Sequence, residues 1–164
     1  MKQEAYLLLG TNLGNRQALL DLAVHSLAEE AGEISAISSI YESMAWGKHD
    51  QPDYLNQVVK LTTPLTPLQL LKIINEIERK LGRERHQKWG PRLIDIDILL
   101  YGNRVVDHPQ LQIPHPHLPN RRFALVPLQE IAPGVIHPAH QKTITELLAC
   151  TPDPLGVRRF RTGK

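Results

Sequence analysis

The chain contains two helix-like hydrophobic patterns, and the strand-like runs around them occur in a restrictive order. An apolar run from Ala5 to Leu9 precedes the first helical pattern, and two runs, Ile34 to Tyr41 and Tyr54 to Thr62, then follow each other directly. The last run, Arg92 to Tyr101, comes after the second helical pattern. A doubly wound α/β fold needs a helix between successive strands. The order βαββαβ therefore predicts an α+β fold of the ferredoxin-like type, an antiparallel sheet with two helices on one face.

Both helices are defined by their apolar stripes and by their ends. The first stripe ends at Gly32, a residue typical of helix termini. The second helix is predicted to begin at Thr66, with Pro67 in its first turn and Gln69 completing a T-x-x-Q capping box, and to end at Gly82. The stripes consist of Leu19, Leu20, Ala23, Val24, Leu27 and Ala31 in the first helix and Leu70, Leu71, Ile74, Ile77 and Leu81 in the second.

Beyond Tyr101 the chain is proline-rich, and we expect a hairpin and short helices attached to the core. Gly102-Asn103 predicts a turn into a strand at 104–106 that pairs with the preceding strand. Helices are expected from Asn120 to Ile131 and from a capping box at Thr143. The last cluster of arginines, Arg158, Arg159 and Arg161, is expected to lie on a solvated face or tail.

Composition limits the class of protein. The 164 residues, 41% hydrophobic and 22% charged, predict a single folded domain over 1–164. A formal net charge of +2 argues against a nucleic-acid packaging protein, and no apolar run reaches the length of a membrane span. The apolar run at the N-terminus is too short for a signal peptide, and Cys150 is the only cysteine. We therefore expect a cytoplasmic monomer that binds neither nucleic acid nor membrane.

Asp95 and Asp97 lie two places apart in the last strand-like run and alternate with Ile94, Ile96 and Ile98. In a strand, residues i and i+2 point to one face about 6.7 Å apart, whereas on a helix they diverge by about 200°. Two neighbouring carboxylates repel unless a cation lies between them, and hard oxygen ligands favour Mg²⁺. The pair predicts a magnesium site; the alternative is one exposed acid and one partner for Arg92.

A basic segment directly precedes the two aspartates and favours phosphate binding. Residues 79–92 carry six lysines and arginines against one acid, Glu84. Neither a P-loop nor a G-x-G-x-x-G motif is present. Two rival functions stay open here. One is a nucleotidyl transferase with a D-x-D metal site; the other is an RNA-binding sheet, which needs aromatic residues on its strands.

The run 88-KWGPRLIDIDIL-99 resembles the signature of the 6-hydroxymethyl-7,8-dihydropterin pyrophosphokinase family of folate biosynthesis. The resemblance covers most of the chain, because GTNLGN at 10–15, DQPDYLNQV at 50–58, IPHP at 113–116 and NRRFAL at 120–125 occur in the same order. It implies a ferredoxin-like core and transfer of pyrophosphate from ATP to the pterin hydroxymethyl group, leaving AMP. ATP, the pterin and two Mg²⁺ ions are the implied partners.

The resemblance also assigns roles to individual residues. Asp95 and Asp97 would hold the two Mg²⁺ ions, and Arg83 and Arg92 match the catalytic arginines. The pterin would be bound by Ser43, Met44, Trp46, Tyr54, Asn56, Trp89 and Phe123. The nucleotide would be bound by Asn75, Glu78, Arg85, Trp89, Arg92, Ile98, His115 and Arg121.

The chain departs from the family pattern at positions near the expected nucleotide. Gln110 stands where an arginine binds nucleotide in other members, and Pro116-His117 replaces a more aromatic and acidic pair. The arginine-rich loop is also one residue shorter than in well-known members. We expect these departures to alter nucleotide affinity and to leave the reaction unchanged.

Overall fold

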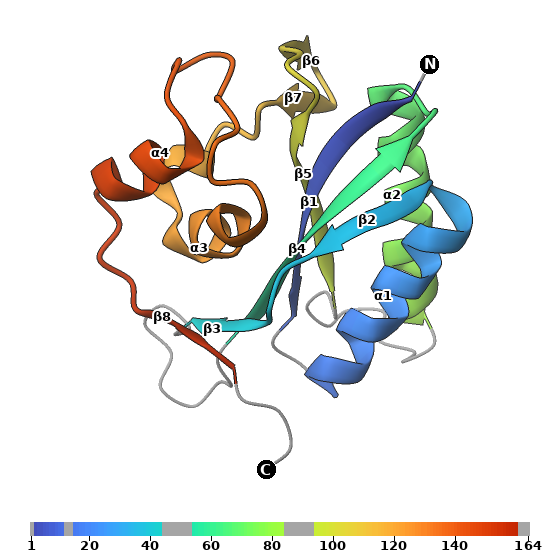
Figure 1. Ribbon diagram of the computed structural model, residues 1–164. Helices are drawn as coiled ribbons and strands as arrows, with labels where there is room; N and C mark the ends of the chain where they lie inside the picture. The colour runs from blue at the N-terminus through green and yellow to red at the C-terminus, as the bar shows by residue number, and fades with distance from the viewer. Residues whose placement is uncertain (1, 12–14, 44–53, 84–93, 161–164) are drawn as a thin grey trace.

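The fold is taken from a computed structural model that describes residues 2–11, 15–43, 54–83 and 94–160 (Figure 1). Its elements, in chain order, are β1 (Gln3–Thr11), α1 (Arg16–Glu30), β2 (Glu33–Ile37), β3 (Tyr41–Ser43), β4 (Tyr54–Thr63), α2 (Pro67–Arg83), β5 (Asp95–Tyr101), β6 (Val106–His108), β7 (Leu111–Ile113), the 3-10 helix η1 (Leu118–Asn120), α3 (Arg122–Ile131), α4 (Ile144–Cys150) and β8 (Val157–Arg159).

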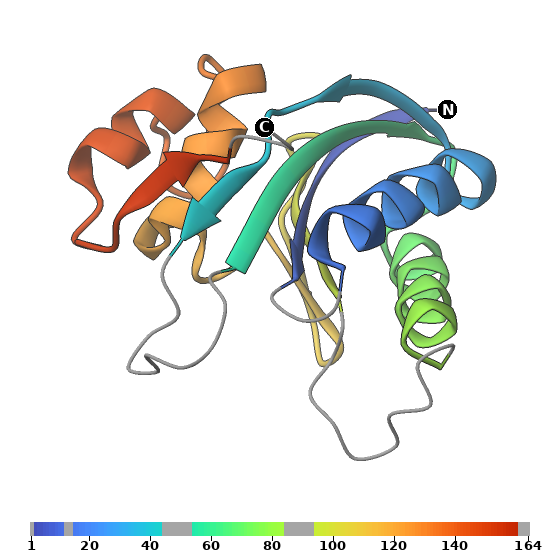
Figure 2. The ribbon, with the colours of Figure 1, turned by 90° about the horizontal axis from the view of Figure 1, so that it is seen from below.

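A six-stranded sheet formed by the described residues is the framework of the molecule. Its strands run in the order β5-β1-β4-β3-β8, and β2 shares with β3 the edge of β4 that faces away from β1. All of these pairs are antiparallel. Helices α1 and α2 cover one face of the sheet, and α3 and α4 cover the other (Figures 1 and 2). The predicted α+β, ferredoxin-like arrangement is confirmed, with a second helical layer added to it.

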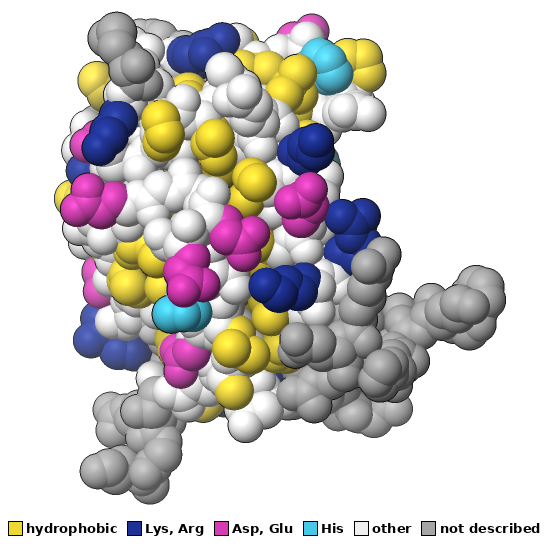
Figure 3. Space-filling view, turned by 90° about the vertical axis from the view of Figure 1, so that its right-hand side faces the viewer, with side chains coloured by type: hydrophobic (Ala, Val, Ile, Leu, Met, Phe, Trp, Pro, Cys, Tyr) yellow, Lys and Arg dark blue, Asp and Glu magenta, His cyan; other side chains and the backbone are white. Residues whose placement is uncertain are grey.

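The sheet separates two hydrophobic cores. Side chains alternate along a strand, so Ala5, Leu7 and Leu9 of β1 pack towards α1 and α2, while Tyr6 and Leu8 pack towards α3 and α4. A central strand covered on both faces has an almost uninterrupted apolar sequence, as β1 does. The outer face of α1 and α2 carries charged side chains of both signs among scattered hydrophobic ones, which is typical of a solvated surface (Figure 3).

The predicted strand from Ile34 to Tyr41 is wrong in one respect, because it is interrupted by a bulge. Ile37 pairs with Val59 and Tyr41 pairs with Asn56, so residues 38–40 face only residues 57–58 of β4. Ser38 fixes the interruption: its N–H donates to the Val58 carbonyl at 2.9 Å, and its Oγ accepts from the Val58 N–H at 2.9 Å. The extra residue reverses the alternation, and Tyr41 therefore points to the α3 side of the sheet.

The predicted hairpin at Gly102-Asn103 is also wrong. The turn itself forms: Gly102 has a φ of +54° and the Arg104 N–H donates to the Tyr101 carbonyl at 3.1 Å. The following segment does not return along β5, however. Instead β6 pairs with β7, with Val106 opposite Ile113, around a turn at residues 109–110. A hairpin is therefore present one turn later than predicted.

Arg158 and Arg159 are exposed, so the prediction of a solvated face or tail holds for both of them. Arg158 and Arg159 belong to β8, which pairs with β3 at the edge of the main sheet. Arg161 lies outside the described residues. The predicted helices at 120–131 and from Thr143 are confirmed as α3 and α4, and Thr143 forms the predicted capping box with Glu146. Among the described residues, no helix combines the length and apolar character that crossing a membrane requires.

Candidate functional site

Asp95 and Asp97 lie on the face of β5 that is turned away from α1 and α2. Ile94, Ile96 and Ile98 are buried in the core on the opposite face, whereas both aspartates are half-buried. The predicted alternation is therefore confirmed. Asp95 stands opposite Gly10 and Asp97 stands opposite Leu8 on β1. The two carboxylates consequently share one side of the sheet with α3, near the end where β1 finishes and β4 and β5 begin.

Gly10 makes room between Asp95 and an amide on the next strand. It pairs with Asp95 on one side and with Asn56 of β4 on the other, so the three residues form a row across the sheet. A Cβ atom at position 10 would lie 2.8 Å from the Asn56 Nδ2 atom. Because strands lie about 4.8 Å apart, Asp95 and Asn56 are separated by about 10 Å of sheet with no side chain between them.

Asn56 is 4% exposed and is held by β3. The Ser43 Oγ donates to the Asn56 Oδ1 at 3.4 Å, which leaves the Nδ2 donors directed away from Ser43. Tyr54 stands opposite Ser43 and is 38% exposed, an unusual amount for an aromatic side chain beside a core. The structure thus brings together three of the predicted pterin residues. Met44, Trp46 and Trp89 lie outside the described residues.

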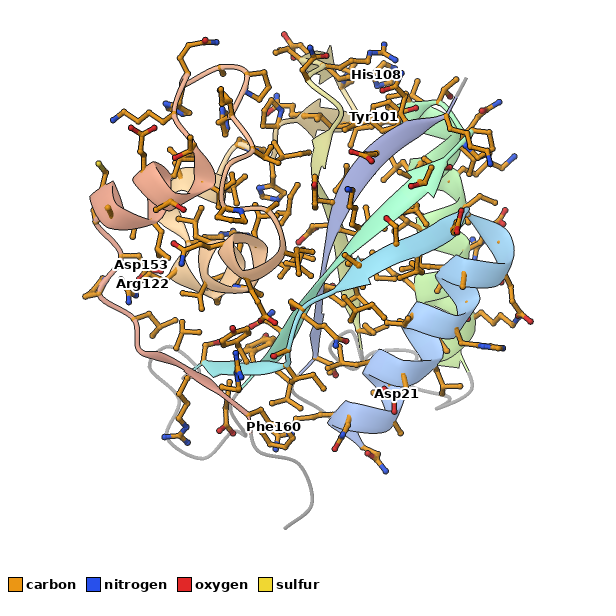
Figure 4. All side chains as sticks on the ribbon, viewed as in Figure 1. Asp21, Tyr101, His108, Arg122, Asp153 and Phe160 are labelled. Atoms are coloured by element: carbon orange, nitrogen blue, oxygen red, sulfur yellow. The ribbon has the colours of Figure 1, made fainter. Side chains whose placement is uncertain are left out.

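The beginning of α3 adds Phe123 and Arg121 to this side of the sheet. The Arg121 guanidinium carbon lies 5.5 Å from the centroid of the Phe123 ring, a cation–π distance. The helix has no side-chain cap at Arg121; instead the Asp153 carboxylate accepts from the Arg122 N–H at 2.9 Å (Figure 4). Asp153 was not predicted to contribute. In the sequence Asp153 stands between two prolines in 151-TPDP-154, and this position gives no indication that it binds the start of α3.

His115 is placed near Asp97 and Arg121. Its N–H donates to the Leu99 carbonyl of β5 at 3.0 Å, and its Nδ1 accepts from the His117 N–H at 3.1 Å. Burial lowers the pKa of His115, the Asp97 carboxylate acts in the opposite direction, and Arg121 and His117 lower it further. A neutral imidazole whose Nδ1 accepts a hydrogen bond carries its proton on Nε2. His115 therefore offers a donor near Asp97.

Of the two residues predicted to bind nucleotide from α2, Glu78 reaches the edge of β5 that no other described strand covers. The Glu78 carboxylate accepts from the Ile96 N–H at 2.7 Å, and Asn75 is exposed on the same helix. The Ile98 side chain is only 4% exposed within the core. In an antiparallel strand alternate residues direct their backbone groups to the same edge, so the Ile98 backbone faces the same side as that of Ile96. Arg83 is the last residue of α2, and Arg85 and Arg92 lie outside the described residues.

Asp95 and Asp97 form a donor set that suits magnesium. Both offer hard carboxylate oxygens, and in the part of the chain that the structure describes no group of three His, Cys, Asp or Glu side chains could hold a metal ion. Mg²⁺ is usually bound by one or two carboxylates together with substrate phosphates and water, not by a complete protein cage. The described residues therefore fit a metal that arrives with its substrate.

Comparison with known proteins places this site in a family. A family model described as 7,8-dihydro-6-hydroxymethylpterin-pyrophosphokinase (HPPK) matches residues 6–133, which is most of the chain. The chain belongs to the HPPK family. Its resemblance to HPPK enzymes, inferred from five sequence blocks, is thereby confirmed.

Individual HPPK relatives match over most of their length. The 2-amino-4-hydroxy-6-hydroxymethyldihydropteridine pyrophosphokinase of Aquifex aeolicus is 48% identical over 141 residues, covering 86% of this chain and 88% of that protein. The enzyme of the same name from Haemophilus influenzae is 43% identical over 145 residues, covering 88% and 90%. That from Bacillus subtilis is 39% identical over 162 residues, covering 98% and 92%.

Solved structures support the HPPK fold. A crystal structure of HPPK-DHPS in complex with substrates matches with a TM-score of 0.73 at 16% identity, covering 90% of this chain and 43% of that chain. The wild-type HPPK-DHPS of Plasmodium falciparum with STZ-DHP matches with a TM-score of 0.74 at 18% identity, covering 91% and 43%. This chain therefore spans less than half of those longer chains, and the likeness concerns the fold.

Proposed function

We infer that this chain is a pyrophosphokinase of folate biosynthesis. It transfers the pyrophosphoryl group of ATP to the hydroxymethyl oxygen of 6-hydroxymethyl-7,8-dihydropterin, forming the pterin diphosphate and AMP. The observation that supports this most directly is the row of Asn56, Gly10 and Asp95 on one face of the sheet, with Asp97 beside it. The row offers an amide for a heterocycle and a pair of carboxylates for metal-bound phosphates, within the length of one small substrate.

For the pterin, we propose that the ring lies between Tyr54 and Phe123. A flat heterocycle with a polar edge calls for aromatic faces and amide donors and acceptors. The exposed Tyr54 ring and the half-buried Phe123 ring come from β4 and from the start of α3, and Asn56 offers its Nδ2 donors next to Gly10. Ser43 would then act by orienting Asn56, since its Oγ donates to the amide oxygen. Met44, Trp46 and Trp89 stay predictions for the same site.

For the phosphates, we propose that Asp95 and Asp97 would hold two Mg²⁺ ions. Such ions, when bound, neutralise phosphate charge and orient the attacking and leaving oxygens of a displacement. The chain itself contributes a cation and a donor, Arg121 at the start of α3 and the Nε2–H of His115, and His115 lies close enough to Asp97 and Arg121 for their charges to shift its pKa. Arg83, Arg85 and Arg92 are proposed to meet the remaining phosphate charge.

For the nucleotide base and ribose, we propose the free edge of β5. Glu78 already accepts the Ile96 N–H there, so its role would be to fix that edge as well as to face the nucleotide. Backbone groups of Ile98 are the donor and acceptor available on the same edge, and the exposed Asn75 lies on the helix beside it. Gln110 replaces an expected arginine in the turn between β6 and β7, which would weaken contacts to the ribose or phosphates.

Positioning and charge stabilisation are sufficient for phosphoryl transfer, so no covalent nucleophile is required. The hydroxymethyl oxygen would be placed by the pterin ring between Tyr54 and Phe123, and the triphosphate by the aspartate side of the row. A cytoplasmic location, a monomeric state and a single domain over 1–164 belong to the same proposal.

The identity of the products tests this function. With ATP, Mg²⁺ and 6-hydroxymethyl-7,8-dihydropterin, we expect AMP and the pterin diphosphate in equal amounts. Chromatography of the nucleotides against standards distinguishes the outcomes. Formation of ADP, or of free pyrophosphate, would contradict pyrophosphoryl transfer and would favour an ordinary kinase or the nucleotidyl transferase.

A further inference from the structure

A single carboxylate on α3 holds the segment that leads into β3. Glu130 accepts three hydrogen bonds from this segment: from the Ser39 N–H at 3.0 Å, from the Ser39 Oγ at 3.1 Å and from the Tyr41 hydroxyl at 2.7 Å. Tyr41 is 9% exposed, and burial together with the bond to Glu130 raises its pKa. The Tyr41 hydroxyl therefore stays protonated at neutral pH and remains a donor.

The two elements joined by Glu130 carry opposite walls of the proposed pterin site. Phe123 and Glu130 are seven residues apart on α3, which is about two helical turns, so both lie on the same side of the helix. Tyr41 and Ser43 are two residues apart on β3 and share one face of the strand. The contact between Glu130 and Tyr41 thus fixes the separation between the Phe123 side and the Ser43–Asn56 side.

One edge of β3 pairs with β4, and its other edge pairs with the C-terminal strand β8. The Phe160 N–H donates to the Ile40 carbonyl at 2.8 Å, and the Arg159 guanidinium carbon lies 5.9 Å from the centroid of the Tyr41 ring. Glu42 pairs with Arg158 at 3.0 Å and with Arg16 of α1 at 3.6 Å. With both edges of β3 held, a shift of Tyr41 moves Ser43 with it, since only Glu42 separates them.

We propose that Glu130 is a positioning residue for the pterin site: through Tyr41 and Ser39 it sets the distance between α3 and β3. This inference rests on the proposed placement of the pterin between Tyr54, Asn56 and Phe123. Glu130 acts on the site only through Ser39 and Tyr41, which lead into the strand that carries Ser43, so its loss should weaken pterin binding and spare the nucleotide proposed at the β5 edge of the sheet.

The test is the dissociation constant of the pterin, measured by calorimetry in the presence of Mg²⁺ and a non-hydrolysable ATP analogue. Glu130→Ala removes all three acceptors, and we expect its pterin dissociation constant to rise about tenfold while that of the ATP analogue changes less than about twofold. Glu130→Gln can keep three bonds, because its amide oxygen accepts two and its NH₂ donates to the Ser39 hydroxyl. We expect this variant to bind the pterin almost as well as the wild type.

Two further variants keep the test decisive. Tyr41→Phe removes one bond without truncating α3, and its pterin affinity should fall between those of the wild type and Glu130→Ala. Glu146→Ala is the matched control, because the Glu146 carboxylate also accepts a backbone hydrogen bond, from the Thr143 N–H at 2.8 Å, but on α4. It should lower the melting temperature and leave pterin binding unchanged.

Equal pterin affinity in the wild type, Glu130→Ala and Tyr41→Phe would overturn the positioning role while leaving the proposed function intact. A parallel loss of pterin and nucleotide affinity would overturn it too, since that is the result of general destabilisation. A wild-type protein that binds no pterin at all would overturn both the inference and the proposed function.

Discussion

At the scale of single residues, the site depends on where side chains are absent as much as on where they are present. Asp95 and Asp97 could be selected from the sequence because a carboxylate inside a strand-like run needs a partner or a function, whereas Asn56 was selected only through the family resemblance. Gly10 could not be selected in the same way, since a glycine after a strand is also an ordinary turn residue. Only its register, between Asn56 and Asp95, shows its importance.

Replacing Gly10 by alanine should therefore weaken pterin binding selectively, at a moderate cost in stability. The new Cβ would lie 2.8 Å from the Asn56 Nδ2 atom, and the amide would have to move. We expect a KM for the pterin at least about tenfold higher, a KM for ATP nearly unchanged, and a loss of stability of about 1–2 kcal/mol. Steady-state kinetics with each substrate varied, together with urea unfolding, measures both effects.

Gly134→Ala is the control for this prediction, because a Cβ at position 134 meets nothing within 4 Å. Both kinetic constants should be unchanged in the control. A pterin KM in Gly10→Ala equal to that of the wild type would show that Asn56 does not read the pterin from its present position.

At the scale of elements, the sequence predicts regular structure well and its interruptions poorly. The two helices and the strands β1, β4 and β5 have clear periodicity, and α4 has a complete capping box. The bulge at residues 38–40 was missed because its cause is tertiary: Ser38 bonds to Val58, twenty residues away. The pairing of β8 with β3 was missed for the same reason, since an arginine-rich edge strand resembles a solvated tail.

The turn after α3 leads to a prediction of pH dependence. His137 is 3% exposed, and its Nδ1 accepts from the Ala139 and His140 N–H groups, both at 3.1 Å. Burial, assisted by His140, lowers its pKa from 6.5 to about 4. Between these values the unfolded chain binds a proton that the folded chain does not, so stability falls as the pH drops from about 6.5 to about 4.

His137→Asn should reduce this loss of stability. Asparagine keeps an acceptor for the same two N–H groups but does not titrate. Between pH 7 and pH 4.5 we expect the wild type to lose about 2 kcal/mol more free energy of unfolding than the variant does. Urea unfolding at the two pH values measures the difference, and His25→Asn, at an exposed position on α1, should behave like the wild type. An identical loss in the wild type and His137→Asn would contradict the prediction.

At the scale of the whole molecule, one sheet separates two tasks. The face covered by α1 and α2 is filled with aliphatic side chains and holds the strands in register. The other face is covered by α3 and α4 over part of its area, and its remaining end carries Asn56, Gly10, Asp95 and Asp97 with Phe123 and His115 nearby. Tyr54, Asn56, His115, Arg121 and Phe123 are far apart in sequence from each other and from the two aspartates, so only the family resemblance could assign them to the same site.

We propose that Asp95 and Asp97 serve the reaction and not the fold, and substitution of each by asparagine distinguishes these two roles. Asn keeps the shape and removes the charge, so we expect the rate of AMP formation to fall by at least about a hundredfold in Asp95→Asn and in Asp97→Asn. The melting temperatures should stay close to the wild-type value. Asp107→Asn, on the exposed face of β6, should retain full activity. Full activity in either of the first two variants, with the protein folded, would show that the substituted carboxylate is not needed for pyrophosphoryl transfer.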